Sequence, residues 1–560
     1  MRKTSFYILL ILLLSAAGLF AGKIKELNFN GQTSFRPEYL NQLCGFEPGS
    51  GTTSAKLQTG LERILREFQQ SGYLMAVLKA EYSEDSSVVA IKIEQGDLCT
   101  IDHLLIAGNK YIGQAYLSDF IGAKPGGIFS QEQVSEDINN LVRTYAENGY
   151  PHASVTVSDF SLIEGHISYS YQITEGPRVI IEKILFRDNK QTNYNTILRL
   201  SGLKQGTLFN PKAVEEGRKR LMKSNLFQSV GGPVLFAGQR EGFENLVLTV
   251  KEGRYNSILG AIGYNQGSDQ EKGWLTGSFD LAFANIGGTG RRAKVSWQRL
   301  RQESSRLSAE FSTPWIFSLN MGITAAVSHR LEDSTYTQST GRIIADFPAG
   351  EYFTAGVGAE AVRVVPGSTQ LIKKNMKYSS LWYLEADYRD SDNNQRGFLS
   401  KLEIEYGQKK YYESSTQLTV SRIKFDGSQV WNIFDRQSLF LAGHGRVVVS
   451  SEKPVPRSDQ FAMGGANSLR GYWEEQFIAN QLAWGNLEYR YSPDRRLELF
   501  PFYDLGYYYD PERSQRGYRS GYGAGFRMDT VLGWISLVYG LGKGDKWGQG
   551  KIHIGINSDF

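Results

Sequence analysis

The residue types that most often perform catalysis or bind metal ions form no recognisable site in this sequence. The six histidines lack the close spacing of metal ligands and are scattered along the chain, at His103, His152, His166, His329, His444 and His553. We find neither a phosphate-binding loop of the Gly-x-x-x-x-Gly-Lys type nor a Gly-x-Ser-x-Gly nucleophile turn. The glycine-rich segment 521–525 has no helix after it and is better interpreted as part of a strand. The sequence therefore predicts a protein that is not an enzyme and needs neither a metal nor a cofactor.

Charge and cysteine content narrow the function further. The chain carries 62 basic and 58 acidic residues, and this net charge of +4 gives no electrostatic basis for binding nucleic acid. Two cysteines, Cys44 and Cys99, are too few for a disulfide framework. Cys44 precedes Gly45 at the predicted end of a helix, and Cys99 lies in the joint between two predicted domains. We therefore expect free thiols, or at most an incidental bridge.

The first residues indicate export from the cytoplasm. Basic residues at 2–3 precede an apolar run at 6–14 and small residues at 15–18, which is the pattern of a secretory signal peptide. The alternative, a membrane anchor, needs roughly 20 apolar residues, and the run is shorter than that. Either Ala17 or Ala21 could end the signal. After it, no segment is apolar for long enough to predict a transmembrane helix.

Residues 24–253 contain one unit three times, at intervals of about 77–80 residues. Each copy opens with a strand of alternating apolar residues, which are Ile24, Leu27 and Phe29, then Ile101, Leu104 and Ile106, then Ile181, Ile184 and Phe186. The order of elements is β-α-α-β-β, which predicts a three-stranded sheet covered by two helices. After a signal peptide at 1–21, we place the copies at 22–97, 98–177 and 178–253.

The longer helix of each copy has recognisable boundaries. Ser130 and Gln133 form a capping-box pattern, and Gly149 is a stop signal. In the third copy Asn210 is the predicted cap and Pro211 the first helical residue, and this helix is about one turn shorter. Each copy then closes on a similar acidic or polar turn, at 94–96, 174–176 and 251–253.

Each predicted sheet leaves two edge strands whose backbone groups are unpaired. Such edges can accept an extended guest strand, although the domains could also be spacers with no client. This unit resembles the polypeptide-transport-associated (POTRA) domain, and the resemblance covers all three copies. Three units in tandem behind a signal peptide are more specific than any one of them.

From about residue 254 onwards the helical spacing disappears and alternating strand-like segments separated by polar turns recur. Roughly 306 residues remain, and at roughly 19 residues per strand and connection they give about 16 antiparallel strands of a transmembrane barrel. The last strand has one apolar face, formed by Ile552, Ile554 and Ile556, and the chain closes on Phe560. This ending resembles the terminal signal by which outer-membrane barrels are recognised for insertion. A soluble β-sandwich is the alternative.

Four motifs in this half resemble those of the outer-membrane β-barrel assembly superfamily, which includes BamA, TamA and the two-partner secretion transporters. The segments are Asn-Ile-Gly-Gly-Thr-Gly at 285–290, Phe-Ser-Thr-Pro-Trp at 311–315, Gly-Gly-Ala-Asn-Ser-Leu-Arg-Gly-Tyr at 464–472 and Phe-Tyr-Asp-Leu-Gly at 502–506. Each motif alone is modest evidence, but their order along the chain is specific. Together with the three POTRA-like copies, the resemblance covers almost the whole mature chain.

The resemblance implies a loop that folds back into the barrel lumen. Its motif here is Leu469, Arg470, Gly471 and Tyr472, and the implied acidic partners of the arginine are Asp504 and Glu488. A guanidinium offers five donors in a fixed fork, which two carboxylates could satisfy. A solvated loop with a turn at the glycine is the alternative. The family often has an acidic residue in the penultimate strand, where this chain has Val538.

The resemblance also implies the function of an assembly factor that folds and inserts β-barrel clients into the outer membrane. The barrel would open at a seam between the first strand, 256–265, and the last, 551–560. The predicted seam residues are Gly260, Ala261 and Gly263 in the first strand and Ile552, Ile554, Gly555 and Ile556 in the last. Glycine weakens a strand interior, so we expect looser pairing across this seam. A client strand at an open edge would satisfy its backbone polar groups.

The expected partners are unfolded outer-membrane proteins, outer-membrane lipid and possible periplasmic or inner-membrane accessory proteins bound by the POTRA arm. The expected location is the outer membrane, with the amino-terminal domains in the periplasm. A secretion pore of the two-partner type is the alternative function. Those transporters typically carry two POTRA domains and a plug helix, for which there is no room between Gly22 and Ile24. A passive porin would have no reason to carry the POTRA arm.

Overall fold

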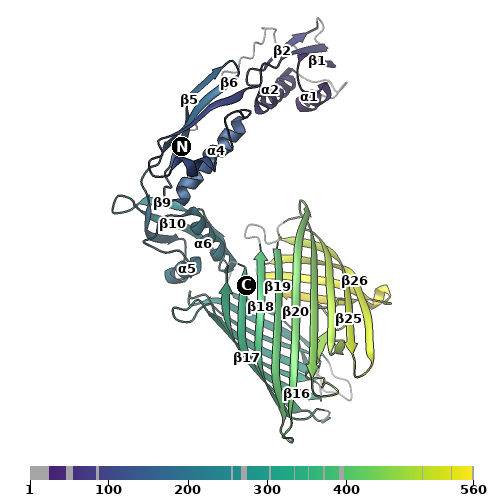
Figure 1. Ribbon diagram of the computed structural model, residues 1–560. Helices are drawn as coiled ribbons and strands as arrows, with labels where there is room; N and C mark the ends of the chain where they lie inside the picture. Colours follow the sequence, from purple (N-terminus) through teal and green to yellow (C-terminus); the bar gives the residue numbers. More distant parts are fainter. Residues whose placement is uncertain are drawn as a thin grey trace. The chain divides into compact units, whose positions relative to one another are not determined.

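The fold is described from a computed structural model of the chain (Figure 1). The described residues are 24, 26–45, 54–83, 88–253, 256–265, 274–301, 304–332, 335–350, 352–369, 372–389, 397–494, 496–530 and 533–557. The signal peptide and Phe560 lie outside these ranges and stay predictions. The chain divides into two compact units, one with the first two repeats and part of the third, the other with the rest of the third repeat and the remaining chain.

The first two repeats confirm the predicted order β-α-α-β-β. The first contains β1 (Glu26–Gln32), α1 (Pro37–Cys44), α2 (Ser54–Gln70), β2 (Val77–Tyr82) and β3 (Val88–Glu94). The second contains β4 (Thr100–Ala107), α3 (Gln114–Ser118), α4 (Gln131–Glu147), β5 (Ser154–Ile163) and β6 (His166–Thr174). The sheet orders are β1-β3-β2 and β4-β6-β5, so the last strand of each repeat is central. Cys44 and Cys99 are buried free thiols.

The third repeat corrects the prediction of three strands. It contains β7 (Ile180–Arg187), α5 (Tyr194–Ser201), α6 (Pro211–Lys223), β8 (Phe227–Val230), β9 (Val234–Ala237) and β10 (Phe243–Glu252). Its sheet has four strands, because the chain between β8 and β10 folds back and pairs β9 with β10. The cap on α6 is in place, since Asn210 Oδ1 accepts hydrogen bonds from the backbone N–H groups of Lys212 and Ala213.

The acidic or polar turn that closes each repeat has a structural cause. A side-chain oxygen of Gln95, Glu175 or Glu252 accepts hydrogen bonds from the loop that follows the first strand of the same repeat. The donors are the backbone N–H groups of Ser34 in the first repeat, Lys110 and Tyr111 in the second, and Lys190, Gln191 and Thr192 in the third. One side chain thus fixes the loop of each repeat.

Replacing Glu252 by alanine is expected to free this loop in the third repeat. The N–H of Thr192, a buried residue, lies 2.6 Å from the carboxylate and would lose its acceptor, at a cost of roughly 1–3 kcal/mol. Limited proteolysis of the full-length protein in detergent should then show faster cleavage near 188–193. Glu241→Ala, which removes an exposed carboxylate of the same repeat, is the control, and equal cleavage in both variants would contradict the anchor.

The same carboxylate makes the loop sensitive to acid. Burial raises the pKa of Glu252, but hydrogen bonds from the backbone N–H groups of Thr192, Lys190 and Gln191 lower it more, so the net pKa lies below its ordinary value. A carboxyl whose pKa is lowered by folding stabilises the fold above the unfolded pKa of about 4.3. This contribution is lost as the pH falls through the lower pKa of the folded state. At that pH we expect the loop to be cleaved faster in the wild type, whereas acid should not accelerate its cleavage in E252A, which lacks the carboxyl group.

The second half forms one antiparallel sheet of 16 strands, which confirms the predicted number, and it curls into a barrel (Figure 1). The strands are β11 (Asn256–Asn265), β12 (Trp274–Ile286), β13 (Arg291–Arg301), β14 (Ser304–Thr313), β15 (Gly322–Glu332), β16 (Tyr336–Ala349), β17 (Phe353–Pro366), β18 (Asn375–Arg389), β19 (Gly397–Tyr411), β20 (Gln417–Phe434), β21 (Gln437–Ser450), β24 (Gln481–Tyr491), β25 (Leu497–Asp510), β26 (Gln515–Thr530), β27 (Gly533–Gly542) and β28 (Lys551–Asn557). Each strand pairs with the next one in this order, so β11 and β28 are the two ends of the sheet.

Alternation along the strands separates an apolar outer face from a polar inner face. On β19, Leu402 and Ile404 are exposed, whereas Glu405 and Lys409, on the opposite face, are buried. Lys409 Nζ lies 2.7 Å from Asp459 in the long connection between β21 and β24, so this buried face is the lumen side. Apolar residues outward and polar residues inward are the pattern of a transmembrane barrel. None of the helices in the described ranges is both long and apolar enough to span a membrane.

Candidate functional site

The long connection 451–480 between β21 and β24 folds against the inner wall of the barrel. It contains a small hairpin, β22 (Phe461–Met463) and β23 (Phe477–Ala479), and its apolar side chains pack with those of the wall. Leu469, the first residue of the predicted motif, is fully buried in this cluster beside Met463 and Trp484. Gly471 has a φ of 89°, and a Cβ there would lie 2.5 Å from the carbonyl carbon of Leu541. Only glycine fits this position without displacing the wall.

The arginine of the motif lies between the two carboxylates that the resemblance implied. Arg470 Nε and Nη2 donate to the two oxygens of Asp504 at 2.8 and 2.6 Å, and Nη1 donates to Glu488 at 2.6 Å. The backbone N–H of Arg470 also donates to Asp504, at 2.9 Å. The guanidinium carbon lies 3.8 Å from the centre of the Phe502 ring. All three ionised side chains are at most 6% exposed, so this is a buried, bidentate pair.

Further charges surround this pair and balance it. Glu488 also accepts from Arg490 on its own strand and from Arg527 on β26, and Arg527 reaches Glu498 at 2.6 Å. Three arginines thus face three carboxylates across β24, β25, β26 and the loop. The rings of Phe500 and Phe502 on β25 lie beneath the guanidinium groups of Arg527 and Arg470. Removing Arg470 would take away the arginine that is ion-paired with the buried carboxylate of Asp504.

The same motif contacts strands up to the carboxyl-terminal end of the sheet. The hydroxyl of Tyr472 donates to the carbonyl of Ser520 at 3.1 Å and accepts from the N–H of Lys543 at 3.0 Å. The N–H of Gly471 donates to Nε2 of His553 on β28 at 3.2 Å. Val538 lies in β27 and packs against Phe500 and Phe502.

The predicted seam residues lie on the two ends of the sheet. Gly260, Ala261 and Gly263 are in β11, which pairs with β12 over ten positions from Asn256 to Asn265. The others lie in β28, which pairs with β27 over seven positions, and they are Ile552, Ile554, Gly555 and Ile556. Within the part of the chain that the structure describes, no hydrogen-bonded ladder joins β11 to β28. Ile552 is 66% exposed on the outer face.

Comparison with known families decides what this arrangement belongs to. A model described as the Omp85 superfamily domain matches residues 285–560. A model described as the surface antigen variable number repeat, the POTRA unit, matches residues 22–96, 100–176 and 179–253. The chain belongs to the Omp85 superfamily. This confirms the resemblance drawn from the four motifs and the repeats.

Two curated relatives carry the same name. The outer membrane protein assembly factor BamA of Nitratidesulfovibrio vulgaris is 23% identical over 533 residues, which cover 86% of this chain and 65% of that protein. BamA of Buchnera aphidicola is 25% identical over 320 residues, which cover 54% of this chain and 51% of that protein. The chain therefore spans less than two thirds of the length of the relatives it matches.

A solved structure shows the same fold. The crystal structure of BamA from Haemophilus ducreyi lacking POTRA domains 1–3 has a TM-score of 0.52 and 15% sequence identity, and covers 81% of this chain and 98% of that chain. The barrel lies in the bacterial outer membrane, and the three POTRA domains lie in the periplasm.

Two of the Omp85 motifs connect the third POTRA domain to the barrel. In the turn 285–290, Asn285 Nδ2 donates to Thr192 Oγ1 at 2.8 Å, and the carbonyl of Gly288 accepts from Thr196 Oγ1 at 2.8 Å. In the motif 311–315, the centre of the Trp315 ring lies 4.8 Å from the guanidinium carbon of Arg199. The carbonyl of Leu319, after the motif, accepts from Arg199 Nη2 at 2.7 Å. The loop that Glu252 fixes is therefore also the loop that contacts the barrel.

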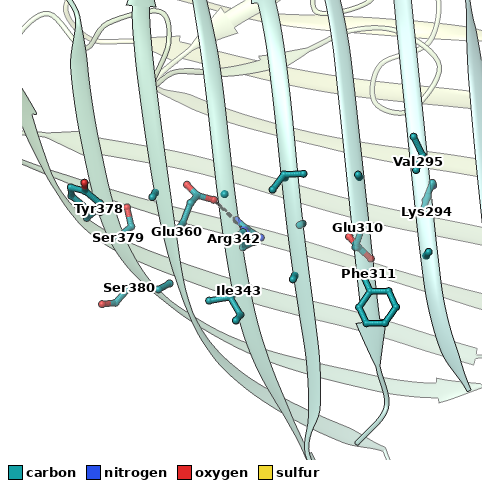
Figure 2. Close-up of a pocket in the computed structure, with 18 of the residues that line it drawn as sticks. Lys294, Val295, Glu310, Phe311, Arg342, Ile343, Glu360, Tyr378, Ser379 and Ser380 are labelled. Atoms are coloured by element: carbon teal, nitrogen blue, oxygen red, sulfur yellow. Dashed lines mark hydrogen bonds and ion pairs between the residues drawn. The ribbon is translucent and has the colours of Figure 1, made fainter. Parts of the chain in front are cut away.

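A hollow of about 1090 Å³ on the barrel wall belongs to the outer face (Figure 2). Its margins carry exposed apolar and aromatic side chains such as Phe311, Ile343 and Tyr378, and small residues form its floor. Arg342 and Glu360, also drawn in Figure 2, pair with each other on the lumen side of the same strands. Because the hollow lies on the outer face, whereas the loop contacts the lumen side of the wall, we assign it no part in the site.

Sequence reasoning named Arg470 and its partners but missed the residues around them. Arg490, Glu498, Arg527 and His553 carried no motif, yet Glu488 and Arg490 have the same parity on β24, and Glu498 and Asp504 have the same parity on β25. Charged residues that share one face of neighbouring strands were the sequence signal that could have predicted this cluster. Among the residues that the structure covers, no group of His, Cys, Asp and Glu side chains is arranged to hold a metal ion.

Proposed function

We propose that this Omp85 protein folds β-barrel clients and inserts them into the outer membrane by adding their strands at the seam between β11 and β28. The observation that carries the proposal is that these strands end a sheet of 16 strands, without a ladder between them in the described residues. An unpaired edge inside a membrane is costly, because hydrocarbon offers its N–H and C=O groups no partner. A client strand supplies those partners, so the edge can act as a template.

The pairing of the last strand fits this role. Over the described residues, β28 pairs with β27 at seven positions, whereas β19 pairs with β18 at fifteen. Fewer ladder hydrogen bonds hold the last strand to the wall, so it can move at lower cost than a central strand. Gly260, Gly263 and Gly555 lie within these strands, and glycine in a strand interior generally weakens the strand.

The POTRA domains supply edges for delivery of an extended client. In the first domain β2 lies at the edge of its sheet, and in the second β5 does. β5 is interrupted by a bulge between Ser158 and Ser161, where Asp159 has a φ of 53°, and such a bulge limits pairing with a further strand. The regular edge of β2 is the better acceptor. Unfolded outer-membrane proteins, outer-membrane lipid and accessory proteins at the POTRA arm are the partners that follow from this function.

Depletion of the protein in its own bacterium tests the proposal. Mass spectrometry of the outer membrane should show a broad loss of β-barrel proteins, while lipid-anchored proteins of the same membrane keep their levels. Loss of only one or two barrels would restrict the proposal to dedicated clients. Unchanged barrels together with loss of one secreted polypeptide would contradict it, and would favour a secretion pore of the two-partner type.

A further inference from the structure

The lumen loop is also bound to β14 and β15, which lie far along the sheet from the strands that hold Arg470. Glu475, five residues after Arg470, has one carboxylate oxygen 2.7 Å from Arg306 Nη2 and the other 2.5 Å from Arg330 Nη2. Arg306 lies on β14 and Arg330 on β15, which are the fourth and fifth strands counted from β11. Arg330 is itself held by Glu332, at 2.6 Å.

One short segment, 470–475, is therefore bound to strands on both sides of the seam. Arg470 is bound to β24 and β25, and Gly471 is bound to His553 on β28, the last strand of the sheet. Glu475 is bound to strands near the beginning of the sheet. A movement that separates β14 and β15 from β28 must therefore either stretch the segment 470–475 or release one of its ends.

The two ends differ in how firmly they are held. The side chains of Glu488 and Asp504 are 3% and 0% exposed, whereas those of Glu475 and Arg306 are 35% and 44% exposed. Partly exposed ion pairs are screened by water and contribute little each, while a buried pair is costly to break. The Glu475 end is the one that can be released at low cost.

We propose that Glu475 is a positioning residue that braces β14 and β15 against the lumen loop and so restrains the opening of the seam. This inference rests on the proposed function only in taking the seam to be the route of the client. The brace itself is a property of the barrel and can be measured without a client.

The neighbouring carboxylate supplies a matched control. Glu474 accepts a hydrogen bond from the N–H of Ala466 at 2.7 Å, a contact within the loop. Glu474→Gln and Glu475→Gln remove the same charge from adjacent positions, and each keeps an oxygen that can accept a hydrogen bond. Only the second removes the carboxylate that is directly ion-paired with Arg306 and Arg330.

Hydrogen–deuterium exchange of the full-length protein in lipid nanodiscs tests the brace. Amides of β11 and β28 in E475Q should exchange about tenfold faster than in E474Q and the wild type, as expected for the loss of two partly exposed ion pairs. The rate is taken relative to the central strands β18 to β20, so that a general loss of stability is not counted. Equal relative rates in E475Q and E474Q would overturn the proposal.

A mutant cycle distinguishes loss of this one interaction from a general loss of barrel stability. The double variant E475Q/R306Q should exchange no faster at the seam than E475Q, because both changes remove the same ion pair. Additive rates would overturn the brace. Client insertion is measured separately on the same variants. Faster seam exchange with unchanged insertion would keep the brace and count against the seam as the client's route.

Discussion

Replacing Arg470 by alanine lowers the temperature at which the folded barrel unfolds and reduces activity. The change removes the three hydrogen bonds that the Arg470 side chain donates, two to Asp504 and one to Glu488. Both carboxylates stay buried. Breaking a buried pair in this way costs roughly 3–5 kcal/mol. Glu488 keeps Arg490 and Arg527, so we expect the larger disturbance at Asp504, beneath the loop.

Heat-modifiability on gels measures the first effect, and complementation of a depleted strain measures the second. Arg436→Ala, at an exposed arginine in the turn between β20 and β21, is the control and should leave both unchanged. Arg470→Lys should be intermediate, because an ammonium group cannot reproduce the planar fork that bridges two carboxylates. If R470A unfolds at the wild-type temperature and complements fully, the buried pair does not hold the loop.

A disulfide between β11 and β28 abolishes activity, and reduction restores it. Closing the seam covalently leaves the lumen, the loop and the POTRA domains unchanged but denies a client access to either edge. We place one cysteine at Ala261, in the middle of β11, and scan its partner around Ile554 on β28. The background carries Cys44→Ala and Cys99→Ala and must be active by itself, since both native thiols are buried in the POTRA half.

The matched control places a disulfide across an internal pair of neighbouring strands. Ser380 on β18 and Tyr406 on β19 are register partners with exposed side chains, so cysteines there can be linked without closing the seam. We expect this second disulfide to leave activity unchanged. A complete β11–β28 crosslink, verified by mass spectrometry, in a fully active protein would show that clients do not use the seam and would favour passage through the lumen.

The order of elements could be predicted because it depends on residues that are close in sequence. Apolar spacing of about 3.6 and of 2 residues distinguishes helix from strand over single segments, and a cap such as Asn210 acts within one turn. This was sufficient for two complete repeats and for the 16 strands. It failed for β9, whose four residues are too few to show a period and which forms only because β10 offers it an edge.

The Arg470 site was reached by a different route. No spacing in the sequence connects Arg470 with Glu488 and Asp504, and the family's motifs supplied the pairing that the structure places together. Glu475 had no such motif, and its partners Arg330 and Arg306 lie 145 and 169 residues away. Which side chains meet across a lumen depends on the tilt and stagger of all the strands and on the path of the loop between them. Those quantities exist only once the whole sheet has curled, so no local pattern carries them.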